Sequence, residues 1–123
     1  MASSSHPRIL VYKADGAIQK GAAVKGGSDK NHVALATAAS DKIIGWAQCA
    51  SAAAGDKIEI ALPGGGAKVL CGAGAVSCGD LLTAGAAGVA VSTSTNADRY
   101  GAVAMQDAVS GDLFDAEIQI GIV

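Results

Sequence analysis

Short hydrophobic runs, each closed by a turn signal, recur along almost the whole chain. Residues 57–62 (KIEIAL) alternate between apolar and charged side chains, and residues 113–122 alternate over a longer distance. Alternation with a period of two predicts β-strands that bury one face. The sequence PGGG at 63–66 cannot continue a central strand and predicts a turn.

Ten further runs predict short strands at 9–12, 17–19, 22–25, 32–37, 43–49, 67–71, 74–77, 80–83, 88–92 and 100–106. Such a rhythm of short strands and turns is typical of all-β sandwiches and barrels. Alanine favours helix, so 50–54 and 106–110 are candidates for a single helical turn. Glycine and β-branched residues interrupt every longer candidate. The predicted fold is mainly all-β, a compact β-barrel or β-sandwich of short strands with at most one short helix.

The pattern of the first half of the chain returns in the second half. The sequence IGWAQCASAAAGDKIEIAL at 44–62 is similar to YGAVAMQDAVSGDLFDAEI at 100–118, and the similarity extends back to cover 16–62 and 74–118. Two copies are too few for a solenoid, but they fit two β units that pack their apolar faces together. Chance similarity in a sequence so rich in alanine and glycine is the alternative. We therefore predict an internal two-fold repeat with its seam at 63–66.

Small side chains dominate the composition, with 27 Ala and 17 Gly among 123 residues. Each small side chain buries little apolar area, so the core of a lone subunit should be thin. Association of subunits is the usual remedy, and large apolar residues are then either core or subunit interface. The candidates for these two roles are Trp46, Phe114, Ile118, Ile120 and Ile122.

Charge, hydropathy and cysteine content argue against nucleic acid or a membrane as partners and indicate the compartment in which the protein is made. The net charge is −2 and no basic cluster exists, so we expect no nucleic-acid partner. The start of the sequence lacks the pattern of a secretory signal, and the uncharged stretches 69–79 and 81–97 are too interrupted for membrane-spanning helices. Three cysteines with no paired spacing indicate reduced thiols and synthesis in a reducing cytoplasm.

No set of residues has the pattern of a catalytic or metal site. His32 begins a predicted strand after a polar loop, and His6 lies in the polar segment at the start of the chain. A Cys–His–Asp arrangement with His32 is the weak alternative. The aspartates that follow glycine are favoured there as turn formers. The glycine-rich loops 21–28 and 64–69 lack the phosphate-binding pattern. We predict a protein that is not an enzyme and has no cofactor, metal or small-molecule substrate.

The order of these segments resembles a known family. The run IIGWAQ, the segment GDLLTAGAAGVAV, the later run RYGAVAMQDA and the closing strand with GD-x-F-x-x-E-I-Q-I are similar to the small capsid decoration, or cement, proteins of tailed bacteriophages. The resemblance extends from about residue 8 to residue 123. It implies a compact β domain at 9–123 preceded by an extended polar arm at 1–8.

The resemblance also implies a location and partners. A decoration protein is part of the virion, binds the outer surface of the head as a homotrimer that bridges major capsid proteins, and stabilises the shell against the pressure of packaged DNA. Many weak contacts joined in one trimer act with a high effective concentration. The arm is the candidate for contact with the capsid, and a disordered tail is its alternative. Its residues are Ala2, Ser3, Ser4, Ser5, His6, Pro7 and Arg8.

Two other kinds of binding or structural protein compete with this interpretation. A tail or baseplate component of a phage would share the composition and the compartment of a decoration protein. A small β-barrel subunit that binds a ligand would need aromatic platforms, and the chain has one Trp, two Tyr and one Phe.

Overall fold

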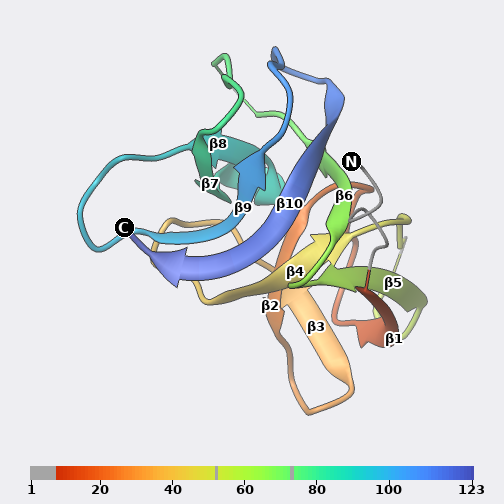
Figure 1. The fold of residues 1–123 in the computed structure, drawn as a ribbon. Coiled ribbons are helices and arrows are strands. Elements are labelled where there is room, and N and C mark those ends of the chain that lie inside the picture. Colours follow the sequence, from red (N-terminus) through yellow and green to blue (C-terminus); the bar gives the residue numbers. More distant parts are fainter. Residues whose placement is uncertain (1–7, 52, 73) are drawn as a thin grey trace.

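The computed structural model describes residues 8–51, 53–72 and 74–123, and β-strands dominate this part of the chain (Figure 1). The strands are β1 (Arg8–Ala14), β2 (Ala23–Gly26), β3 (His32–Leu35), β4 (Ile43–Ala47), β5 (Lys57–Leu62), β6 (Gly66–Leu70), β7 (Leu81–Ala84), β8 (Ala90–Ser92), β9 (Arg99–Ala104) and β10 (Leu113–Ile122), with a 3₁₀ turn, η2 (Ala86–Gly88), before β8. The predicted all-β fold is confirmed.

The first five strands close into a small barrel in the order β1-β3-β2-β4-β5. Antiparallel pairing of β1 with β5 runs from Arg8 opposite Leu62 to Lys13 opposite Lys57. The barrel closes through a short parallel contact of β1 with β3, at Lys13 and Ala14 only. The first half of β1 therefore has a strand neighbour on one edge alone among the described residues.

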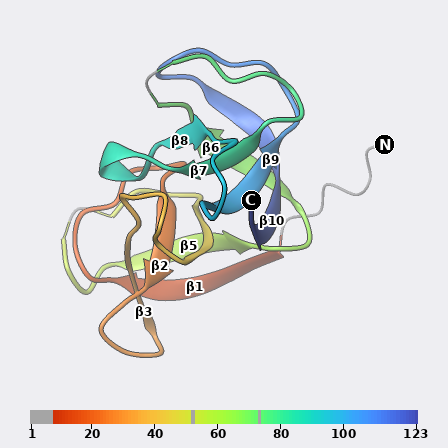
Figure 2. The ribbon, with the colours of Figure 1, turned by 90° about the vertical axis from the view of Figure 1, so that its left-hand side faces the viewer.

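The last five strands repeat this arrangement in the order β6-β10-β9-β7-β8. If β6 to β10 are matched in chain order with β1 to β5, the sequence of neighbours is the same in both halves. This second set is an open sheet, and a single isolated parallel bridge between Cys71 and Ala90 lies where the first barrel has the contact of β1 with β3. Figure 2 shows the two units, one above the other.

The loops of the two halves also use the same hydrogen bonds. Ile18 and Ser51 form an isolated antiparallel bridge, and Val76 and Ala108 form its counterpart. We propose that residues 16–62 and 74–118 are two copies of one β unit, joined at the turn of residues 63–65 that leads into β6. We also propose that the two copies fold as the single domain 9–123.

Two core clusters fill the interior. One lies within the first barrel, and the other joins residues of the second half to residues of the first, including Ile43 and Trp46. Trp46 on β4 is fully buried, and its Nε1 donates a hydrogen bond of 3.0 Å to the carbonyl oxygen of Gly101 on β9. The two units therefore meet through equivalent strands.

Three expectations about local structure need correction. Residues 17–19 and 74–77 are not strands, because each contributes only one bridging residue, Ile18 or Val76, to its neighbouring loop. The expected helical turn is absent from 106–110 and from the described residues of 50–54, since Ala108 and Ser51 use their backbone groups in those same bridges. The only helical turn in the described part of the chain is η2.

Candidate interaction surfaces

The predicted polar arm falls almost entirely outside the described residues. Ala2, Ser3, Ser4, Ser5, His6 and Pro7 are not described, and Arg8 is the first described residue. Arg8 was expected to end the arm, but it begins β1, because its backbone pairs with Leu62 of β5. Its side chain is exposed and close to the turn at Gly64.

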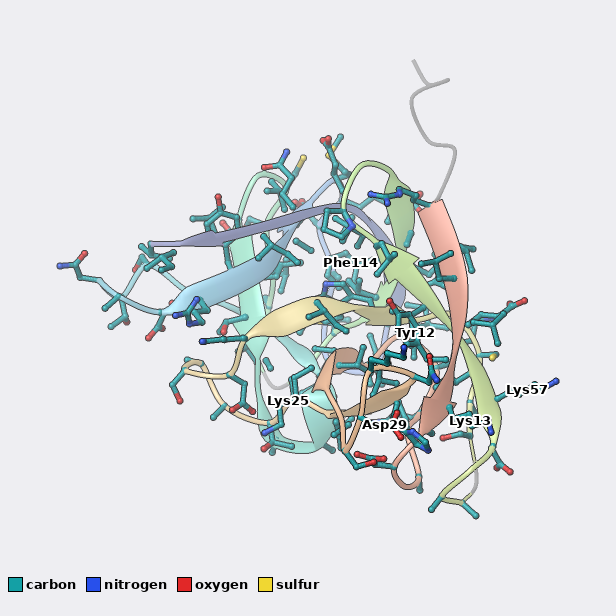
Figure 3. The ribbon with its side chains drawn as sticks, turned by 90° about the horizontal axis from the view of Figure 1, so that it is seen from below. Tyr12, Lys13, Lys25, Asp29, Lys57 and Phe114 are labelled. Atoms are coloured by element: carbon teal, nitrogen blue, oxygen red, sulfur yellow. The ribbon has the colours of Figure 1, made fainter. Side chains whose placement is uncertain are left out.

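The five predicted core or interface residues separate into two groups. Trp46, Phe114 and Ile118 are buried, and Figure 3 shows Phe114 inside the second unit. Ile120 and Ile122 continue the alternation of β10 but are exposed, with Ile122 at 58%. The change follows from a register shift between Ile118 and Gly121, after which β10 has β9 as its only neighbouring strand among the described residues. We call Ile120 and Ile122 the β10 patch.

The first half of β1 is a second exposed apolar surface. Ile9, Leu10 and Val11 are all exposed, with Val11 at 60%, although consecutive residues of a strand point to opposite faces. Both faces of β1 therefore reach solvent here. The sequence predicted this strand but not its exposure. The one sign of this exposure in the sequence is that the run ILVY does not alternate between apolar and polar residues. A fully buried strand has the same continuous apolar pattern. We call these three residues the β1 patch.

A third exposed apolar group lies on the loop between β9 and β10 and on the first residue of β10. Met105, Val109 and Leu113 are exposed, and Val109 borders a shallow depression of about 280 Å³. The equivalent positions in the first unit are Gln48, Ala53 and Lys57, which are polar or small. The two copies thus share a scaffold and differ in the chemistry of this surface. We call Met105, Val109 and Leu113 the loop patch.

Polar side chains gather at the far end of β1 (Figure 3). The Nδ1 atom of His32 lies 2.7 Å from Oδ1 of Asp29, and this hydrogen bond, with a second from the backbone N–H of Asn31, lowers the pKa of Asp29. Asp15 accepts hydrogen bonds from the backbone N–H and the hydroxyl of Ser28. These contacts shape the loop between β2 and β3, and His32 has Asp29 as its side-chain partner.

The three cysteines lie in three different environments. All three are free thiols: Cys71 is buried, Cys49 is partly buried and Cys78 is exposed. Burial raises the pKa of Cys71, which keeps its thiol protonated at neutral pH. The Sγ atom of Cys49 accepts a hydrogen bond from the backbone N–H of Glu59. Cys49 and Cys71 therefore have the surroundings of packed side chains in a β scaffold.

Within the described residues, no group of three or more potential metal ligands comes together, and no helix is long and apolar enough to cross a membrane. The features that the geometry does bring to the surface are the β1, β10 and loop patches. Exposed apolar groups of this kind are suited to contacts with other proteins.

Comparison with solved structures finds the same fold in a phage protein. The chain is similar to the crystal structure of the head fiber gp8.5 N base in bacteriophage phi29, with a TM-score of 0.70 and 20% sequence identity. The similarity covers 91% of this chain and 93% of that chain. No protein-family model and no curated protein sequence matches the chain. The similarity in structure shows a shared fold.

Proposed function

We propose that this chain is a structural protein of a tailed-phage virion that binds the outer surface of the head and stabilises the capsid shell. The observation that supports it most is the fold, which covers nearly all of a chain described as the base of a phage head fiber. The resemblance of the sequence segments to capsid decoration proteins points to the same part of the virion. In this proposal the partners are the major capsid protein and further copies of the chain, assembled as a homotrimer.

The mechanism we propose is mechanical. The apolar β1 and β10 patches of one subunit offer contact area to neighbouring proteins, and each contact covered adds roughly 25 cal/mol per Å² of apolar surface. A trimer that holds several capsid subunits at once must lose many such contacts before the shell opens. The polar arm that precedes β1 is the proposed capsid contact outside the β domain. Catalysis, a cofactor and a small-molecule ligand have no part in the mechanism.

The experiment that tests this proposal is a cryo-electron microscopy reconstruction of the virion that carries the protein. We expect density for the two-unit β domain on the outside of the head, at threefold or quasi-threefold positions between capsid subunits. Density in the tail or baseplate would support the alternative role as a tail component. Density on the head at other symmetry positions would contradict the trimeric arrangement but keep the role on the head.

A further inference from the structure

The β1 and β10 patches share three properties. Each consists of exposed aliphatic residues, Ile9, Leu10 and Val11 in one and Ile120 and Ile122 in the other. Each lies on a strand segment with one open edge among the described residues, because β3 joins β1 only from Lys13 and β6 leaves β10 at Glu117. An open, apolar strand edge is a template for pairing with another strand.

The other side of the β10 segment is already covered. A side chain at Gly121 would meet the ring of Tyr100, whose hydroxyl oxygen lies 2.6 Å from the position of the missing Cβ. Tyr100 is also the residue opposite Gly121 on β9. The ring of Tyr100 therefore packs over Gly121 and supports the paired ends of β9 and β10. The side chains of Ile120 and Ile122 remain exposed.

The two patches lie on different sides of the molecule. In Figures 1 and 3, β1 is at the right and the arrow end of β10 is at the left. Because they lie far apart, the two patches of one subunit cannot cover each other. A contact between two different surfaces is heterologous, and repeated around an axis it closes a ring of identical subunits. Pairing of β1 with β1 across a twofold axis would leave the β10 patch exposed.

The charges near the two patches permit such a contact. Exposed or half-exposed side chains of both signs flank each one, with Arg8 and Glu59 beside the first and Arg99 and Glu117 beside the second. Within the described part of the chain, the side chains of these four residues form no ion pair with one another. The contact therefore does not bring together two surfaces of like charge, which would oppose binding.

We propose that the first half of β1 in one subunit pairs with the end of β10 in a second copy of the chain, head to tail, and that three such contacts close the ring. Main-chain hydrogen bonds along the two open edges would fix the alignment, and the β1 and β10 patches would cover each other. This inference rests on the proposed homotrimer and names the surfaces that form it.

The test uses two variants, each of which damages one patch. Val11→Lys places a charge in the β1 patch, and Ile122→Lys places one in the β10 patch. Val109→Lys is the matched control, because Val11 and Val109 are the same residue with the same exposure of 60%. All three positions are exposed, so the folded state should be retained, which the buried environment of Trp46 reports through its fluorescence.

Light scattering after size-exclusion chromatography gives the mass of each assembly. We expect three times the 11.9 kDa chain mass for the original protein and for Val109→Lys, and the mass of a monomer for Val11→Lys and for Ile122→Lys. An equimolar mixture of the two damaged variants should give a dimer. Each variant keeps the patch that the other has lost, so one intact contact can form.

Three results would overturn the proposal: an original protein that is monomeric, a single variant that still forms the trimer, or a mixture that stays monomeric. Location on the head is measured separately. If the mixture forms the dimer but the protein is absent from heads, the interface stands and the proposed function fails. If the protein decorates heads but the mixture stays monomeric, the proposed function stands and the proposed interface fails.

Discussion

The two β units have the same order of strands, but they differ in what fills and surrounds them. The first unit encloses a core of its own, built on residues such as Ile58 and Ile60. The second shares its core with residues of the first, above all Trp46. By the pairing of β4 with β5 and of β9 with β10, the position equivalent to Trp46 is Val103, a smaller side chain that is only partly buried. The large buried ring of the first unit therefore has a smaller counterpart in the second unit.

Agreement between the units is concentrated in the turns. Gly21 and Gly79 have positive φ angles of 84° and 93°, and each donates its backbone N–H to the last residue of the strand β4 or β9. Asp56 and Asp112 each accept a hydrogen bond from the backbone N–H of the residue three positions earlier. The turns therefore determine the shared fold, whereas the exposed apolar patches have no equivalent in the other unit.

The largest effect should come from removing the residue that joins the units. Trp46→Ala deletes a fully buried ring and the hydrogen bond to Gly101, and we expect a loss of about 3–5 kcal/mol in the free energy of unfolding. Trp46→Phe keeps most of the ring and should lose about 1–3 kcal/mol, since the carbonyl oxygen of Gly101 remains without its partner. Urea unfolding followed by circular dichroism measures both. Losses below about 1 kcal/mol would show that the units do not depend on this contact.

A pair of glycine substitutions tests a second contact between the two units, that of Gly21 with Leu70. Gly21→Ala and Gly79→Ala both place a methyl group on left-handed backbone, which costs roughly 1–2 kcal/mol. At Gly21 the new Cβ would also lie 2.7 Å from the backbone nitrogen of Leu70 in the second unit, whereas at Gly79 nothing lies within 4 Å. Overpacking should add about 1–3 kcal/mol at Gly21 alone. Equal losses in urea unfolding would contradict the packing described here.

A buried hydroxyl gives a stabilising prediction. Thr83 on β7 is buried, and its Oγ1 atom has no hydrogen-bond partner in the described part of the chain. The equivalent residue of the first unit, Lys25, reaches Asp41 with its amine, at 3.4 Å. Thr83→Val replaces the hydroxyl by a methyl group of similar shape and should stabilise the protein by about 1 kcal/mol. A lower melting temperature would show that the hydroxyl has a partner, such as an ordered water.

The smallest expected effect is on the stability of the protein at acidic pH. Hydrogen bonds from the backbone N–H of Ser77 and the hydroxyl of Ser92 lower the pKa of Asp80, whose equivalent in the first unit is Ala22. A lowered pKa in the folded state contributes stability above the ordinary value of 3.8, and this contribution is lost as pH falls through the folded pKa. Asp80→Asn should lose about 1 kcal/mol at neutral pH and show a shallower decline below about pH 4. Parallel curves of stability against pH for the two proteins would contradict it.

The sequence predicted what depends on local chemistry. Alternation in 57–62 correctly placed Ile58 and Ile60 inside, and PGGG correctly marked the turn before β6. It did not predict that both faces of the first half of β1 are exposed to solvent. A continuous apolar run has the same pattern whether other strands cover it or not. It also did not predict where β10 leaves the core, since that depends on where its neighbour β6 begins, at Gly66.

The most direct test of the proposed role is the heat resistance of phage heads with and without this protein. Heads that lack it should release their DNA at a lower temperature, and adding the purified original protein should restore the higher one. The Val11→Lys variant should restore it only in part, because single subunits lose the avidity of a trimer. A release temperature that is the same with and without the bound protein would contradict the account.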